Sequence, residues 1–255
     1  MTIRVIVAWM SGSSTHGEIA IFGPMMRILP NALTLCNLIA GSCAIAALFE
    51  GMPRVTLVLA GLCLVLDLLD GFLARRLKVS SALGVQLDSL ADLVSFGVLP
   101  GCIVFQFQSE LCEGPLLISW LPFTAFLIPA GVALRLARFN LDTRDRTVFY
   151  GLPTPSAATF LFGFLWMLVA EHAWLKFICL PVILYSLVLL LPLLMLSNIR
   201  LWSIKGLGHK HGKWILGGFL IAFILLLVFT GSAGVPLIVI TYILFGIFNY
   251  FLKLY

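Results

Sequence analysis

Five long segments of the chain contain no Asp, Glu, Lys or Arg, and this pattern restricts the fold more than any other feature. They are residues 28–49, 114–134, 147–170, 177–199 and 214–252. A helix needs about 20 mostly apolar residues to cross a bilayer core, and each segment is long enough. Hydrophobic residues make up 61% of the 255 residues and charged residues 11%. A soluble domain of this size cannot bury so much apolar surface, so the sequence predicts an integral membrane protein.

These segments predict an all-α fold with about eight transmembrane helices. The last segment has 39 residues, too many for one crossing, and a turn-forming stretch at 231–236 divides it into a hairpin. The expected spans are 31–49, 55–77, 83–107, 117–141, 155–170, 175–197, 214–230 and 235–252. Residues 1–30 are expected to form an N-terminal segment with an interfacial helix, residues 31–205 a core, and residues 206–255 a C-terminal helical hairpin.

The basic residues predict the orientation. With these spans, fourteen of the sixteen Lys and Arg residues fall on one side of the membrane, and Arg54 and Lys176 are the exceptions. Because cytoplasmic loops carry an excess of basic residues, both termini should be cytoplasmic, in a bacterial-type cytoplasmic membrane. The net charge of +5 reflects this excess of basic residues and favours binding to anionic lipid headgroups. The sequence shows no soluble domain that would support binding to nucleic acid.

Four aspartates interrupt the second and third apolar segments. Asp67 and Asp70 are three residues apart, and Asp88 and Asp92 are four apart, so each pair lies on one face of its helix. The polar stretch 75–81 joins the two helices as a cytoplasmic turn. At about 1.5 Å per residue, Asp70 and Asp88 lie at a similar depth of roughly 10 Å below that turn. The four carboxylates should therefore share one cavity that faces the cytoplasm.

Such a cluster in apolar helices requires cations. An ionised carboxylate near the centre of a bilayer costs about 2.5–3.5 kcal/mol on insertion scales, and four of them repel one another. All-oxygen ligands favour Mg²⁺, Mn²⁺ or Ca²⁺, and two such ions can clamp a phosphoryl group. Gly71, Ala74 and Gly84 lack bulk on the same faces, and Arg75 is within reach of a diphosphate. Two other interpretations of the acids are an intramembrane ion-pair network and a cation pathway.

The pattern Asp-x-x-Asp-Gly-x-x-Ala-Arg, a short gap, then Gly-x-x-x-Asp-x-x-x-Asp resembles the signature of the CDP-alcohol phosphotransferase family. All eight fixed positions match, over 26 residues. The resemblance implies membrane-embedded, usually homodimeric enzymes that transfer a substituted phosphate from a CDP-linked alcohol to a hydroxyl group and release CMP. It assigns two Mg²⁺ or Mn²⁺ ions to the acids and residues 31–205 to the catalytic core. By this resemblance the metal ligands are Asp67, Asp70, Asp88 and Asp92, of which Asp92 is also the catalytic base, and the CDP-binding residues are Asp67, Gly71, Ala74, Arg75 and Gly84.

Four further segments indicate the acceptor. Residues 29–37, 95–100, 135–140 and 149–157 resemble the branch of that family that uses CDP-diacylglycerol and L-serine. A serine carboxylate needs a cationic site, and Arg135, Arg138 and Asn140 at the end of the fourth span are the expected acceptor-binding residues. The two arginines also fit positive-inside anchors that extend toward lipid headgroups.

Alternative functions remain open on the sequence alone. The same chemistry could use glycerol 3-phosphate, an inositol species or choline as acceptor. A divalent-cation transporter using the same acids, and a purely structural membrane protein, are the alternatives from other classes. Release of CMP would separate the enzymes from both.

Overall fold

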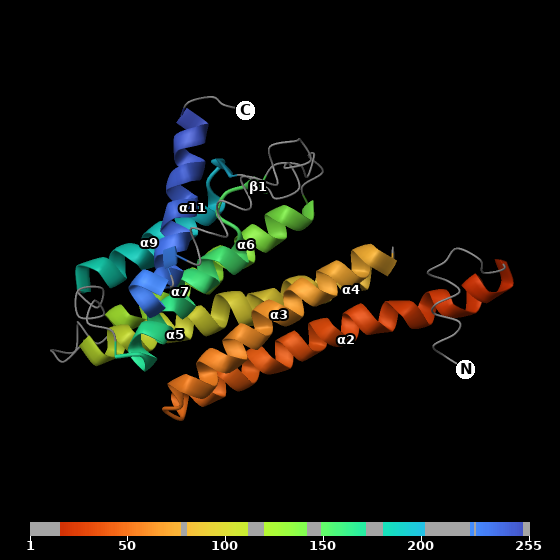
Figure 1. Cartoon of the computed structure of the whole chain (residues 1–255), viewed down its shortest axis with the longest axis horizontal. Coiled ribbons are helices and arrows are strands. Elements are labelled where there is room, and N and C mark those ends of the chain that lie inside the picture. The colour runs from red at the N-terminus through yellow and green to blue at the C-terminus, as the bar shows by residue number, and fades with distance from the viewer. Residues whose placement is uncertain are drawn as a thin grey trace.

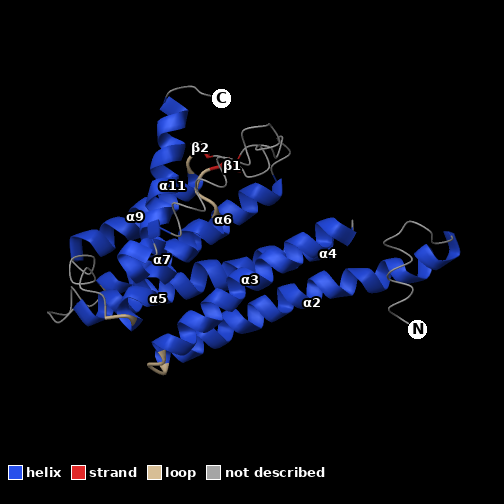
Figure 2. Ribbon diagram, in the orientation of Figure 1, coloured by secondary structure: helices blue, strands red, loops and turns tan. Residues whose placement is uncertain are grey.

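The computed structural model describes residues 16–77, 81–111, 120–141, 149–171, 181–201, 225–226 and 228–251. These residues are almost entirely helical (Figure 2). The described strands, β1 (Phe149–Tyr150) and β2 (Arg200–Leu201), form one short antiparallel pair with Phe149 opposite Leu201. The prediction of an all-helical protein is confirmed for this part of the chain.

Two long helices, α2 (His16–Phe49) and α3 (Pro53–Leu77), form an antiparallel hairpin (Figure 1). In the turn between them Gly51 has a φ of 69°. The Gly51 N–H donates to the Leu48 carbonyl at 3.1 Å, and the Met52 N–H donates to the Ala47 carbonyl at 2.9 Å. This is a Schellman ending, which favours glycine at the left-handed position. Pro53 then begins α3 where its missing N–H costs no helical bond.

One continuous helix crosses the centre of the molecule. It consists of α4 (Ala82–Leu93), a π-helical turn η1 (Val94–Val98) and α5 (Leu99–Leu111). It is the most buried of the long apolar helices in the described residues. Gly41 of α2 packs against Ser95, and Gly97 packs against Val132 of α6 (Leu127–Leu141). A Cβ at Gly97 would lie 3.1 Å from Val132 Cγ1, so glycine allows close packing here.

Helix α6, η2 (Leu121–Phe126), α7 (Thr154–Val169) and α9 (Pro181–Leu196) contact this central helix (Figure 1). The other two elements, η4 (Gly231–Ala233) and α11 (Gly234–Phe251), pack against α7. Helix α7 packs against α3, α5 and α11, and α6 packs against α9. Gly131 of α6 lies against Pro192 inside α9, where an added Cβ would come within 2.6 Å of the proline Cβ.

Four described helices are long and apolar enough to cross a membrane: 28–49, 53–77, 82–110 and 121–141. Shorter apolar helices cover 154–169, 181–196 and 228–244. Large apolar side chains on α3 face outward, with Val58 71% and Leu68 70% exposed. Such a surface is stable in lipid and not in water. The expected span at 214–230 lies largely outside the described residues, and the expected break after it coincides with η4.

Candidate active site

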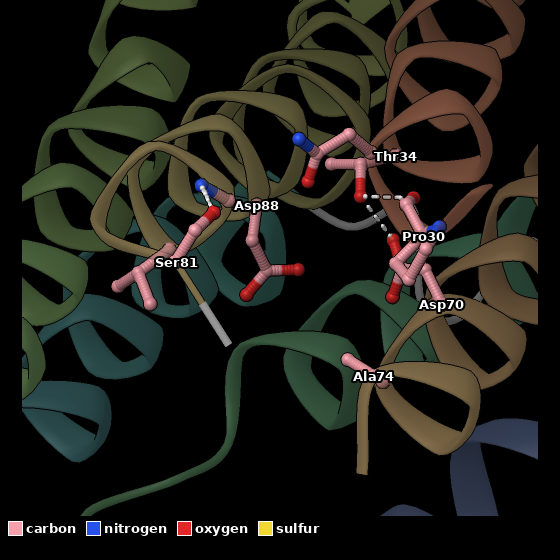
Figure 3. A pocket seen from close by; sticks show the side chains of 10 residues that line it. Pro30, Thr34, Asp70, Ala74, Ser81 and Asp88 are labelled. Carbon is pink, nitrogen blue, oxygen red and sulfur yellow. Dashed lines mark hydrogen bonds between the residues drawn. The ribbon is translucent and has the colours of Figure 1, made fainter. Parts of the chain in front are cut away.

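Three of the four predicted acids come together where α3 and α4 face each other. Asp67 and Asp70 from α3 and Asp88 from α4 each place one carboxylate oxygen within 4.8 Å of the other two. Figure 3 shows the Asp70 and Asp88 side chains extending into the space between the helices. The i, i+3 spacing puts the first two acids on one face of α3, and α4 places Asp88 close to both of them.

Asp92 lies one turn further along α4 and is not part of this group of three. Its side chain is buried, and its Oδ1 atom has no hydrogen-bond partner. It interacts electrostatically with the other three acids and with Arg135 of α6. A buried carboxylate oxygen without a partner is unusual in a folded protein. Asp92 is therefore available to bind or accept a proton from a molecule in the site.

The donor set of Asp67, Asp70 and Asp88 fits a hard divalent cation. All three ligands are carboxylates, and their oxygen atoms converge within one coordination sphere. Three negative charges so close together repel one another unless a cation lies among them. The residues present therefore fit one divalent cation, and a second ion at this site stays a prediction.

A cavity of about 130 Å³ lies beside this cluster, at the open ends of α3 and α4 (Figure 3). A Cβ at Gly84 would lie 3.0 Å from Asn31 Oδ1 and 3.1 Å from Ser81 Oγ, so the glycine keeps this wall open. The Ser81 hydroxyl also caps α4 by accepting from the Gly84 N–H at 3.0 Å. The cavity is lined by Pro30, Asn31, Thr34, Asp70, Gly71, Ala74, Ser81, Gly84, Val85 and Asp88.

Arg75, which is also among the predicted CDP-binding residues, lies at the end of α3 and is exposed. Its guanidinium group folds back over Gly71, where an added Cβ would lie 3.4 Å from Arg75 Nη1. A positive group is thus held next to the cavity wall.

Helix α2 supplies polar residues that the motif analysis did not assign to the site. Thr34 Oγ1 is buried and lies 2.7 Å from Asp70 Oδ2 and 3.0 Å from the Pro30 carbonyl oxygen, both within donating distance. Asn37, one turn further along, is also buried; its carbonyl accepts from Ser95 Oγ at 3.2 Å, and its Oδ1 has no partner. The sequence feature that could have identified Thr34 and Asn37 is their spacing of three residues, which puts two polar side chains on one face of an otherwise apolar helix.

The three predicted acceptor residues at the end of α6 differ in their surroundings. Arg135 is half-buried, and its Nη1 donates to Thr154 Oγ1 at 2.6 Å, while its Nε is buried and unpartnered. Arg138 is exposed. Asn140 Nδ2 donates to Ser89 Oγ at 2.8 Å, which joins α6 to α4 next to Asp88. Arg135 is thus the one of the two arginines that is directed into the protein and interacts with Asp92.

These observations define a cluster of three carboxylates between two membrane helices, with a cavity beside the cluster. A family model described as CDP-alcohol phosphatidyltransferase matches residues 27–204, which include every residue discussed above. The chain belongs to this family, and its apolar helices and membership together indicate a multi-pass membrane protein.

Individual relatives share more than the family motif. The chain is 36% identical over 150 residues to a CDP-diacylglycerol--serine O-phosphatidyltransferase of Mycobacterium tuberculosis (strain ATCC 25618 / H37Rv), covering 56% of this chain and 50% of the relative. It is 33% identical over 205 residues to the Helicobacter pylori (strain ATCC 700392 / 26695) protein of the same name, covering 79% of this chain and 81% of the relative. A Bacillus subtilis (strain 168) protein, also of that name, is 32% identical over 52% of this chain and 72% of its own length. The chain spans about half the length of the mycobacterial relatives it matches.

Proposed function

We propose that the protein transfers the phosphatidyl group of CDP-diacylglycerol to the hydroxyl group of L-serine, giving phosphatidylserine and CMP. The observation that carries the proposal is the cluster of Asp67, Asp70 and Asp88 beside a small cavity. Relatives from mycobacteria, Helicobacter and Bacillus that bear the corresponding name support serine as the acceptor.

The site offers groups for each part of this reaction. Two Mg²⁺ or Mn²⁺ ions bound by Asp67, Asp70, Asp88 and Asp92 would offset the carboxylate charges and polarise the diphosphate. Gly71, Ala74 and Gly84 leave room for the CDP group, and Arg75 adds positive charge at the cavity wall.

The transfer itself uses the buried acid Asp92 and the half-buried Arg135. Asp92, through its unpartnered oxygen, accepts the proton of the serine hydroxyl. The serine oxygen then bonds to the phosphorus that carries diacylglycerol, and the bond from that phosphorus to the CMP oxygen breaks. Arg135 binds the serine carboxylate, because a guanidinium group is well suited to this ion. Arg138 and Asn140 complete the acceptor end of α6.

We propose the arrangement in the membrane on the same basis. The chain crosses a bacterial-type cytoplasmic membrane about eight times, with both termini and the cavity on the cytoplasmic side. Residues 31–205 form the catalytic core, flanked by the N-terminal segment and a C-terminal hairpin, and two chains form a homodimer. The basic residues at the ends of α3 and α6 support this orientation.

The decisive experiment measures CMP release by the purified full-length chain in lipid nanodiscs with CDP-diacylglycerol and Mn²⁺. We expect L-serine to support release, and glycerol 3-phosphate, inositol and choline not to. Asp88→Asn should abolish release, whereas Glu110→Gln, which neutralises an exposed acid at the far end of the same continuous helix, should not. CMP release with another alcohol and not with L-serine would show that the proposed acceptor is wrong. Manganese uptake into proteoliposomes without CMP release would contradict an enzyme.

A further inference from the structure

The hydrogen bond between Arg135 and Thr154 joins two helices next to the site. Arg135 lies in the middle of α6, and Thr154 is the first residue of α7. Arg135 Nη1 donates to Thr154 Oγ1 at 2.6 Å, and Thr154 is 1% exposed. A short, partly buried bond from a charged donor is strong and orients the planar guanidinium group.

This bond uses one of the five N–H donors of Arg135 and leaves others directed elsewhere. Arg135 Nε is buried without a partner, and so is the Oδ1 atom of Asp92, with which Arg135 interacts electrostatically. Buried donors and acceptors are normally paired, so both atoms remain available to a polar ligand. A ligand with both a carboxylate and a hydroxyl group matches this pair.

Thr154 is itself held in a fixed position by the segment before α7. The Gly151 N–H donates to the Ile199 carbonyl at 2.9 Å, and the Leu152 N–H donates to the Leu194 carbonyl at 3.1 Å. Gly151 has a φ of 71° and lies against the backbone at the end of α9. The Thr154 hydroxyl is therefore attached to a rigid support, which is what a group that orients another side chain needs.

We propose that Thr154 is a positioning residue for the acceptor: its hydroxyl holds the Arg135 guanidinium group in the orientation that binds the acceptor carboxylate. This inference rests on the proposed function and deepens it. Thr154 takes no part in the bond changes, and it affects binding of the acceptor rather than of CDP-diacylglycerol.

The test compares Thr154→Val, which keeps the shape and removes the hydroxyl group, with Thr154→Ser, which restores it. The matched control is Thr159→Val in the same helix, because the Thr159 hydroxyl bonds only to the Pro155 carbonyl at 2.7 Å. Serine KM, kcat and the KM for CDP-diacylglycerol are measured by CMP release with Mn²⁺. We expect Thr154→Val to raise the serine KM about tenfold, the effect of losing one hydrogen bond to a charged group. The kcat and the KM for CDP-diacylglycerol should stay near wild type, as should all parameters of Thr154→Ser and Thr159→Val.

Several results would overturn the inference. An unchanged serine KM in folded Thr154→Val would do so, as would a lower kcat with unchanged KM, or failure of Thr154→Ser to restore the KM. Melting temperatures in detergent establish folding, and Thr154→Ala replaces Thr154→Val if the valine variant does not fold. Wild-type protein without serine-dependent CMP release would contradict the proposed function and this inference together. Serine-dependent CMP release by the wild-type protein, together with an unchanged serine KM in Thr154→Val, would contradict only the inference.

Discussion

The hydrogen bond from Thr34 to Asp70 allows a direct test of the proposed metal site. Thr34 Oγ1 lies 2.7 Å from Asp70 Oδ2, both residues are buried, and they come from different helices. Thr34→Val has nearly the same shape and removes only the hydroxyl group. Asp70 would then lose the donor that fixes the direction of its carboxylate within the cluster.

The expected size of the effect follows from this contact. A hydrogen bond to a charged group contributes about 1.5–3 kcal/mol, and about 1.4 kcal/mol corresponds to a tenfold change in an equilibrium constant. Groups that orient metal ligands typically change metal affinity or activity by about 10–100-fold when they are removed. Because the Thr34 hydroxyl also lies 3.0 Å from the Pro30 carbonyl, the bond is shared, and we expect the lower end of this range.

The assay is a Mn²⁺ titration of CMP release in nanodiscs. Thr34→Val should raise the Mn²⁺ concentration for half-maximal release about tenfold, and Thr34→Ser should restore it. The control is Thr56→Val, because the buried Thr56 hydroxyl bonds only to backbone carbonyls at the opposite end of the α2–α3 pair. An unchanged Mn²⁺ requirement in Thr34→Val, or an equal shift in Thr56→Val, would refute the role of Thr34 in orienting a metal ligand.

Two glycine substitutions test the cavity and its support. Gly84→Ala should raise the KM for CDP-diacylglycerol severalfold, because an added Cβ would lie 3.0 Å from Asn31 Oδ1, which also lines the cavity. Gly61→Ala, whose added Cβ would have nothing within 4 Å, should leave this KM unchanged. Equal KM values in the two variants would argue against the proposed nucleotide pocket. Gly151→Ala should lower the melting temperature in detergent more than Gly51→Ala does. Both have positive φ, which costs about 1–2 kcal/mol for alanine, but only the Cβ at Gly151 would also meet the backbone at Met195. Equal losses would show that this contact relaxes freely.

The local pattern of residues determined the class of protein and the elements of its site. Charge-free runs of about 20 residues favour membrane helices, because a helix of that length crosses the bilayer core. The spacings of Asp67 with Asp70 and of Asp88 with Asp92 place each pair on one helix face by geometry alone. Asp70 and Asp88 are only 18 residues apart in the chain, so much of the acidic cluster follows from local sequence.

Tertiary packing decided which groups the two helix faces meet. Thr34 contacts Asp70 only because α2 packs along α3, a contact between residues 36 positions apart. Arg135 and Arg138 have similar local sequence, yet only Arg135 is directed inward, because α7 places Thr154 against it. Asp92 lies apart from the three clustered acids because it is a full turn further along α4 than Asp88. Periodicity determines the face of its own helix on which a residue lies, but the neighbour that covers this face depends on contacts that are distant in sequence.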